Sequence, residues 1–234
     1  MKRLLMLLGI SFLLFSCASQ NNRTRNPDFL ADMDPVSIGS VPMQFEKFLS
    51  SVIEKKDVEV WFDPRIDSVY LQYRYQTGTF RQYWNKSGRL QFITALEKYK
   101  KDYEARNLNL KGARALRAYG ITGGRTIWGQ FSSNVFMNAE ALPKIELGYQ
   151  FKQDSPYFTV HYGSAENIRS TDHQKETSLG MIAYFTRTQA DELAKLFDQQ
   201  YLLSFLGPRP DPGYAAPAQE DDYAGYREAG TGEE

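Results

Sequence analysis

Few residues of this chain have the side-chain chemistry that catalysis or metal binding requires. The two histidines are His161 and His173, and Asp172 is the acidic residue beside the second of them. A metal site needs three or four converging ligands, and no HExxH-type spacing is present. We therefore expect no metal site, with His161 on the polar face of a strand and His173 in a loop.

Nucleophiles and acid–base pairs are equally sparse. No Gly-x-Ser-x-Gly motif occurs, and the only cysteine is Cys17. The glycine-rich residues 120–125 lack the Gly-Lys-Ser/Thr end of a phosphate loop, so a hairpin turn is the better interpretation. Glu146 is expected on the solvated face of its strand, although carboxylate pairs that form in space are invisible in one sequence. We predict no catalytic residue and a protein that is not an enzyme.

Cys17 has a different role, which follows from its position after an apolar leader. Lys2 and Arg3 precede the apolar residues 4–15, which are too few to span a bilayer core that needs about 20. Residues 14–17 read Leu-Phe-Ser-Cys and resemble the lipobox of bacterial lipoproteins. The alternatives are a secreted protein with a free thiol and an uncleaved membrane helix.

The lipobox resemblance implies a cleaved signal peptide and a lipid anchor. Cleavage would fall between Ser16 and Cys17, with a diacylglycerol on the sulfur and a further acyl chain, such as palmitate, on the amino group. More than one chain is needed because each buried methylene adds about 0.8 kcal/mol and one myristoyl chain holds only marginally. No other cofactor is expected. Ala18 and Ser19 lack the aspartate that retains many lipoproteins at the inner membrane, so the outer membrane is preferred.

The composition argues against a dedicated nucleic-acid binder. The chain has 28 basic and 28 acidic residues, and cleavage would remove Lys2 and Arg3, leaving a small negative charge. No second cysteine remains for an intrachain disulfide, so stability must come from the core. Fifteen tyrosines, fifteen phenylalanines and three tryptophans supply apolar area for that core.

Four segments are expected along the chain. Residues 1–16 form the signal peptide, residues 17–41 a polar tether, and residues 42–206 a single domain. Residues 207–234 carry two basic and seven acidic residues with proline and glycine throughout, so we predict a disordered tail.

Hydrophobic periodicity in the domain predicts an α+β fold with an antiparallel sheet of roughly seven strands. Helices are expected at residues 42–55 and 90–106, and residues 113–119 fit either a strand or a helix. A long C-terminal helix should start at Thr186, where Thr186 and Gln189 fit a capping box. This order resembles lipid-binding grip folds at the level of the fold only; otherwise the domain resembles no specific family. The expected strands are residues 58–62, 69–75, 79–84, 125–131, 144–152, 157–163 and 178–185.

Residues 98–125 are the one asymmetrically charged part of the domain, with eight basic and two acidic residues. The residues expected to contact anionic lipid, polysaccharide or an acidic partner are Lys100, Lys101, Arg114 and Arg117. The alternative is an ordinary solvated surface, which is the commoner role of such charges.

Aromatic residues gather in the hairpin predicted from residues 69–75 and 79–84. Such residues suit a cleft for sugar or lipid, but they suit cross-strand packing in the core equally well, and packing is favoured. The residues are Tyr70, Tyr73, Tyr75, Phe80, Tyr83 and Trp84.

These patterns predict a non-enzymatic lipoprotein of the bacterial cell envelope, anchored in a membrane and binding a partner protein or an envelope component. The alternative is a carrier that holds a lipophilic ligand between the sheet and the terminal helix. An envelope hydrolase is the third candidate. An apolar cavity would favour the carrier, a cleft with converging acids or His161 the hydrolase, and a shallow surface the binding protein.

Overall fold

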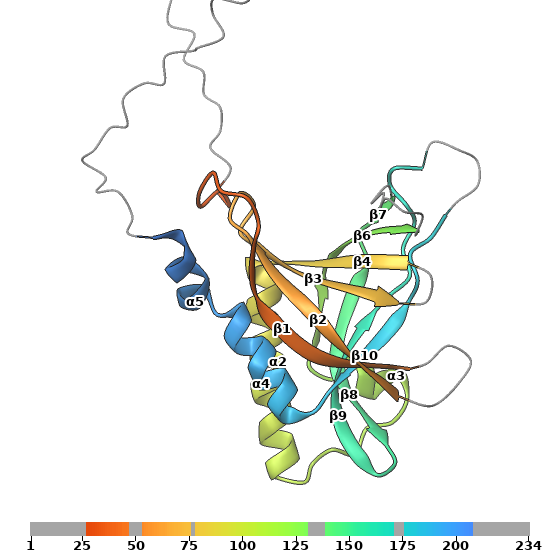
Figure 1. Ribbon diagram of the computed structural model, residues 1–234. Helices are drawn as coiled ribbons and strands as arrows, with labels where there is room; N and C mark the ends of the chain where they lie inside the picture. Colours follow the sequence, from red (N-terminus) through yellow and green to blue (C-terminus); the bar gives the residue numbers. More distant parts are fainter. Residues whose placement is uncertain (1–26, 47–52, 76–77, 131–138, 171–175, 208–234) are drawn as a thin grey trace, which may run out of the picture.

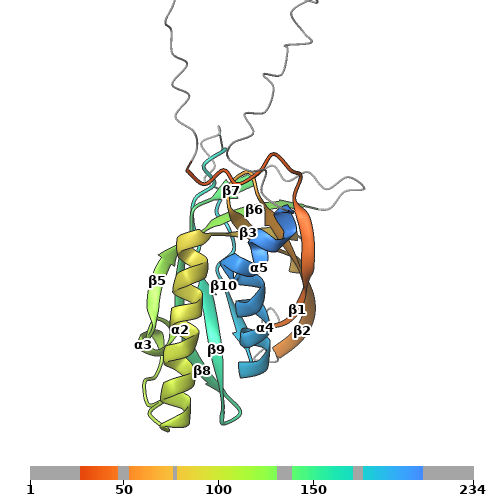
Figure 2. The ribbon, with the colours of Figure 1, turned by 90° about the vertical axis from the view of Figure 1, so that its left-hand side faces the viewer.

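The computed structural model describes residues 27–46, 53–75, 78–130, 139–170 and 176–207. Its centre is one antiparallel sheet in the order β5-β8-β9-β10-β1-β2-β3-β4-β6-β7. The sheet is strongly curled, and helices α2 and α4 lie side by side against its core-bearing side (Figures 1 and 2). The element bounds are β1 Val36–Glu46, β2 Ile53–Asp63, β3 Ser68–Tyr75, β4 Gly78–Asn85, α2 Lys86–Glu104, α3 Ala113–Leu116, β5 Gly120–Gly123, β6 Arg125–Gln130, β7 Ala139–Ala141, β8 Lys144–Lys152, β9 Ser155–Tyr162, β10 Met181–Phe185, α4 Arg187–Phe197, α5 Gln199–Leu203 and the 3-10 helix η1 Ser204–Leu206.

Strands β5 and β7, which stand at the two ends of the strand order, belong to one long hairpin in which β5 and β6 pair with β8 and β7. Strand β5 runs into β6 through Gly124, and β7 runs into β8 through Leu142 and Pro143. The Gly124 N–H donates to the Pro143 carbonyl at 3.0 Å, which carries the pairing through this junction. Since β6 also pairs with β4, and β8 also pairs with β9, the hairpin links both halves of the sheet. The register is the same on both sides of the junction: Thr122 lies opposite Ile145, and Thr126 lies opposite Ala141.

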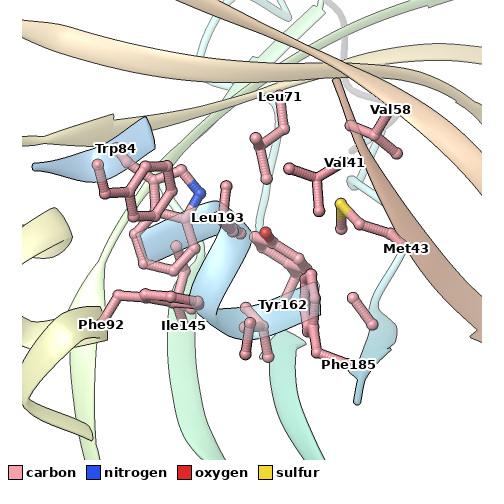
Figure 3. Close-up of a cluster of buried hydrophobic side chains, with 14 of the residues drawn as sticks. Val41, Met43, Val58, Leu71, Trp84, Phe92, Ile145, Tyr162, Phe185 and Leu193 are labelled. Carbon is pink, nitrogen blue, oxygen red and sulfur yellow. The ribbon is translucent and has the colours of Figure 1, made fainter. Parts of the chain in front are cut away.

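The core lies between the curled sheet and the two helices (Figure 3). Phe92 of α2 is at its centre, with ring centroids 5.8 Å from Trp84, 5.4 Å from Phe158 and 5.1 Å from Phe197. Edge-to-face contacts of this kind add to the free energy gained from burying the rings. Helix α2 also buries Ala95, Leu96 and Tyr99, and α4 buries Ala190, Leu193 and Phe197.

The α+β class is confirmed, but the sheet has more strands than the seven predicted. Each expected strand overlaps an observed one, and residues 144–152 coincide with β8. The additional strands are β1, β5 and β7. Strand β7 has three residues and β5 has four, which is too short for an alternating pattern to be recognised.

The helix predicted at residues 42–55 is wrong, because residues 42–46 belong to strand β1 and residues 53–55 to strand β2. Val41, Met43 and Phe45 alternate into the core with at most 1% exposure, and β1 pairs with β2 along almost its whole length. The helical spacing and the period-two spacing coexist in this segment, and pairing with neighbouring strands decides between them. Residues 47–52 lie outside the described residues. Strand β1 starts at Val36, so part of the segment expected as a tether belongs to the sheet.

The long C-terminal helix is not confirmed. The capping box at Thr186 is present, with the hydroxyl accepting from the Gln189 N–H at 3.3 Å and the Gln189 side chain accepting from the Thr186 N–H at 2.9 Å. Helix α4 ends after Phe197, because Asp198 has an extended ψ of 130° and its carboxylate caps the separate helix α5. The segment predicted to be a signal peptide, the predicted cleavage and lipidation residues Ser16 and Cys17, and residues 208–234 lie outside the described residues.

Candidate binding face

The structure brings His161 and Glu146 together on neighbouring strands. They lie directly opposite each other in the β8–β9 ladder, with His161 Nδ1 2.9 Å from a Glu146 carboxylate oxygen. Among the described residues, no group of three or more histidines, cysteines and acids could hold a metal ion. The pair is therefore a cross-strand hydrogen bond on the half-buried outer face. Asp172 and His173 lie outside the described residues.

Residues 120–125 do not form the expected hairpin turn. They run extended through β5 into the start of β6, opposite β7 and β8. A side chain at Gly124 would place its Cβ 2.4 Å from Ile145 Cδ1, so glycine allows the two strands to approach at the junction. The predicted hairpin turn is wrong. The glycines allow two paired strands to approach closely here, and the chain does not reverse direction.

The four predicted basic contact residues differ in their surroundings. Lys100 donates to Glu97 and Asp191 at 3.1 Å each, and these hydrogen bonds raise its pKa. Lys101, Arg114 and Arg117 are exposed, on the last turn of α2 and around α3. In Figure 2 the C-terminal end of α2 and α3 lie away from the N-terminal segment 27–35, which is at the opposite end of the molecule. The structure therefore leaves three of the four available to a partner.

The predicted aromatic cluster divides between the two faces of the sheet. Tyr73, Phe80 and Trp84 point into the core with at most 4% exposure. Tyr70 and Tyr83 alternate with these residues and lie on the outer face, where the core cluster does not extend. The prediction of core packing is thus correct for Tyr73, Phe80 and Trp84, whereas Tyr70 and Tyr83 pack outside the core.

The outer face carries a row of aromatic rings in contact across three strands, which we call the aromatic row: Trp61, Tyr70 and Tyr83. Cross-strand pairing places these residues side by side, Trp61 opposite Tyr70 and Tyr70 opposite Tyr83. The Trp61 and Tyr70 rings are parallel with centroids 6.1 Å apart, and Tyr70 lies 4.9 Å from Tyr83. Arg125 of β6 continues the row, with its guanidinium 5.0 Å from the Tyr83 ring.

A second row of polar residues lies beside the aromatic row. Arg81 Nε donates to the Gln72 side-chain oxygen at 2.7 Å, and the Gln72 amide donates to Glu59 at 2.9 Å. The same Glu59 carboxylate accepts from the Trp61 indole at 3.2 Å. The Arg81 guanidinium lies 5.3 Å from the centre of the Tyr70 ring, which connects the two rows. These contacts fix the orientation of the rings before any ligand arrives.

The tyrosines of the row are neutral at physiological pH. Burial raises the pKa of Tyr70 to about 12, although the nearby Arg81 opposes this shift. Burial likewise raises the pKa of Tyr83. Tyr70 is only 5% exposed, because Trp61, Tyr83 and Arg81 surround it, so a ligand would touch those three residues first.

An ion-pair network holds the end of the aromatic row. Arg125 Nε lies 2.6 Å from one oxygen of Glu140 on β7, and Arg169 lies 2.5 Å from the other oxygen. The hydrogen bond from Arg125 is the main cause that lowers the pKa of the Glu140 carboxyl. Arg125 is therefore positioned by Tyr83 on one side and Glu140 on the other.

The aromatic row ends at a surface cavity of about 810 Å³, a size typical of small-molecule sites. The cavity lies at the junction of the long hairpin, between that junction and the N-terminal end of α2. Tyr83 and Arg125 line it and are thus shared with the row. The other side chains used below are Ser68, Asn85, Thr122 and Lys144, which also line it.

A buried ion pair supports the wall of this cavity and was not predicted from the sequence. Arg89 is 1% exposed and donates to the Asp67 carboxylate at 2.7 Å, to the Asp67 carbonyl and to Gln199 of α5. Burial lowers the pKa of Arg89, and the Asp67 partner opposes that shift. The pair ties the β2–β3 turn to the start of α2. A sequence offers no signal for it, since 22 residues separate the partners.

The fold and this face define a curled antiparallel-sheet domain with an outward aromatic row, and the comparisons place it in a family. Residues 35–204 match the family described as "Uncharacterised Treponema protein", and this chain belongs to that family. The matched range starts one residue before β1 and ends at the start of η1, so it coincides with the described domain.

One relative is a protein of Treponema pallidum (strain Nichols), described as "Uncharacterized protein". It is 30% identical over 155 residues, which cover 66% of this chain and 53% of that protein. The chain therefore spans about half the length of this curated relative. No solved structure matches the chain. Within the described parts of the chain, no helix has the length and apolar character needed to cross a membrane.

Proposed function

We propose that this protein is a non-enzymatic lipoprotein of the bacterial cell envelope that binds an envelope component through the aromatic row. The anchor would be the acyl chains on Cys17, with the outer membrane preferred. The observation that carries the binding proposal is the contiguous Trp61–Tyr70–Tyr83 row on an outer sheet face, with Trp61 stacked on Tyr70 and Tyr83 tilted against it. Its rings are already oriented by Arg81, Gln72 and Glu59, so little conformational entropy is lost when a ligand binds.

The anchor is tested by labelled-fatty-acid incorporation into the full precursor and its Cys17→Ala variant. We expect label in the wild type and none in the variant, because the only thiol has been removed. Incorporation into the variant would remove the lipoprotein proposal but leave the binding proposal intact.

The binding proposal is tested with the mature chain from residue 17, produced without lipid as Cys17→Ser. Co-sedimentation with cell-wall sacculi and with outer-membrane vesicles should separate the two envelope layers. The variant Trp61→Ala/Tyr83→Ala should bind roughly tenfold more weakly, which is 1.4 kcal/mol. Tyr157→Ala is the matched control, since Tyr157 is a half-buried tyrosine that packs against Tyr184 away from the row. Equal binding by the double variant and the control would contradict a role for the row.

The two other candidate functions have less support. A lipophilic ligand held between sheet and helices would have to displace the ring contacts of Phe92 with Trp84, Phe158 and Phe197. A hydrolase that uses the cavity would need an acid there, and the described residues that line it include no carboxylate. Saturable uptake of a fluorescent fatty acid would favour the carrier over the binding protein.

A further inference from the structure

The cavity at the end of the aromatic row has an uneven charge. Of the described residues that line it, Arg125 and Lys144 are cationic and none is acidic. Arg125 is already ion-paired with Glu140, a carboxylate that Arg169 also contacts, so it is not a free cation. Lys144 is exposed at the first position of β8, and its ammonium has no hydrogen bond or ion pair with the residues that the structure describes. The cavity therefore has one uncompensated cation.

The position of Lys144 is fixed by the backbone although its side chain is exposed. It pairs with Gly123 across the hairpin junction, and its carbonyl accepts from the Gly163 N–H at 2.9 Å. Backbone bonds on both sides of β8 thus hold its Cα at the rim of the cavity. The long side chain can reach a ligand inside without a change of fold.

The remaining lining residues are suited to hydroxyl groups. Thr122 is 8% exposed, and within the described part of the chain its hydroxyl makes one hydrogen bond, a long one of 3.4 Å to the Gly123 carbonyl. Ser68 is also buried, with its hydroxyl 3.2 Å from the Ile66 carbonyl. Asn85 accepts from the Gly88 N–H with its side-chain oxygen, which leaves its amide hydrogens for a ligand. Tyr83 also lines the cavity, where its ring lies beside the Arg125 guanidinium.

We infer that the cavity binds an acidic sugar unit, with the sugar ring against Tyr83 and its negatively charged group on Lys144. A sugar ring presents C–H groups to an aromatic face and hydroxyls to Ser68, Thr122 and Asn85. The first turn of α2 at the cavity wall adds a positive dipole end. This inference rests on the proposed function, because the aromatic row would hold the neighbouring units of the same glycan.

The experiment compares D-glucuronic acid, glucose 6-phosphate and glucose as probes of the mature, unlipidated chain. The acids differ from glucose by a carboxylate or a phosphate, so they separate the two possible sources of charge. Binding is measured by isothermal titration calorimetry. We expect at least one acid to bind about tenfold more tightly than glucose, the scale of one charge-assisted hydrogen bond.

Lys144→Gln should remove that preference and leave the affinity for glucose unchanged, while Lys144→Arg should retain it. Lys98→Gln is the matched control, since Lys98 is an exposed lysine of α2 outside the cavity. Equal affinity for all three probes, or a preference that survives Lys144→Gln, would overturn the inference. So would Lys144-dependent binding only to phosphatidylglycerol vesicles, which would assign the cation to a lipid head group.

Failure of this inference is distinguishable from failure of the proposed function. If sacculi binding depends on Trp61 and Tyr83 but the sugar preference is absent, the function stands and the acidic-sugar assignment is wrong. If Lys144-dependent binding of an acid is found without any effect of the aromatic row on envelope binding, the cavity is a separate site and the proposed function is wrong.

Discussion

The two faces of strands β2, β3 and β4 carry the same kinds of residue with different consequences. On the inner face, Trp84 contacts Phe92 and Phe197 of the helices and is 1% exposed. On the outer face, Trp61 stacks on Tyr70 and is only partly buried. The inner rings have ring partners from the helices, whereas among the described residues the ring contacts of the outer row are with one another and with Arg81 and Arg125. The comparison shows that aromatic content alone does not separate a core from a binding face; the partners of each ring do.

The largest expected difference between the two faces is the loss of stability when a tryptophan on each face is replaced by alanine. Trp84→Ala should lower the free energy of unfolding by about 3–5 kcal/mol, since a large buried side chain leaves a cavity. Trp61→Ala should cost less, about 1–2 kcal/mol, because its ring is only partly buried and stacks on one neighbouring ring. Urea unfolding measures both. A cost for Trp61→Ala as large as that for Trp84→Ala would make the outer row a second core.

The next largest effect is expected at the ion pair that holds the cavity wall. Asp67→Ala should destabilise the domain by about 3 kcal/mol, because it leaves the buried Arg89 guanidinium without its charged partner. The control Asp34→Ala removes an exposed ion pair with Arg65 and should cost less than about 1 kcal/mol. Urea midpoints of the two variants, with equal m-values, decide this prediction. Similar midpoints would mean that the buried pair is not needed for the wall.

The third test concerns the exposed basic residues at the end of α2 and around α3, which lie outside the aromatic row. Lys101→Gln, Arg114→Gln and Arg117→Gln together should reduce binding of the unlipidated chain to anionic vesicles, at about 1 kcal/mol per charge. Lys100→Gln should have little effect, since Lys100 is already paired with Glu97 and Asp191. Binding should weaken as salt rises from 0.1 to 1 M, because the Debye length falls from about 10 to about 3 Å. Absence of vesicle binding at low salt would leave these residues as solvated surface.

The smallest expected effect concerns Glu140 at the end of the aromatic row. Arg125 lowers the pKa of this carboxyl below its usual 4.5, so the pair stabilises the fold above that pH. The stabilisation is lost as the pH falls through the lowered value. The melting temperature of Glu140→Gln should therefore lie below that of the wild type at pH 7, and the two should converge as the pH falls below 4.5. A constant difference at all pH values would show that Glu140 acts through packing alone.

Local patterns predicted those parts of the fold that local chemistry decides. The alternation of residues 144–152 gave β8, and the Thr186–Gln189 capping box gave the start of α4. The β1 segment was misread because its apolar residues fit both a helical and an alternating period, and only pairing with β2 and β10 favours the strand. The break at Asp198 depends on one side chain that caps a new helix.

The candidate site was predictable only in part, because it depends on contacts between residues that are distant in the sequence. Alternation separates Tyr70 from Tyr73, so two faces could have been inferred from residues 69–75. The alignment of Trp61 with Tyr70 depends on the register between β2 and β3, which the turn around Asp67 sets. The cavity depends on the hairpin junction at Gly124, whose role is visible only once Ile145 is placed beside it.

The pairing of β1 with β10 sets a condition on the order in which the domain can fold. Phe45 lies opposite Ala183, so this ladder closes a loop that contains nearly the whole domain. A contact between such distant parts of the sequence forms slowly. Because chains are made from the N-terminus, β1 must remain with one edge unpaired until β10 has been synthesised. An unpaired edge invites pairing with other chains, so a domain of this topology would depend on being kept apart from its copies until its last strand arrives.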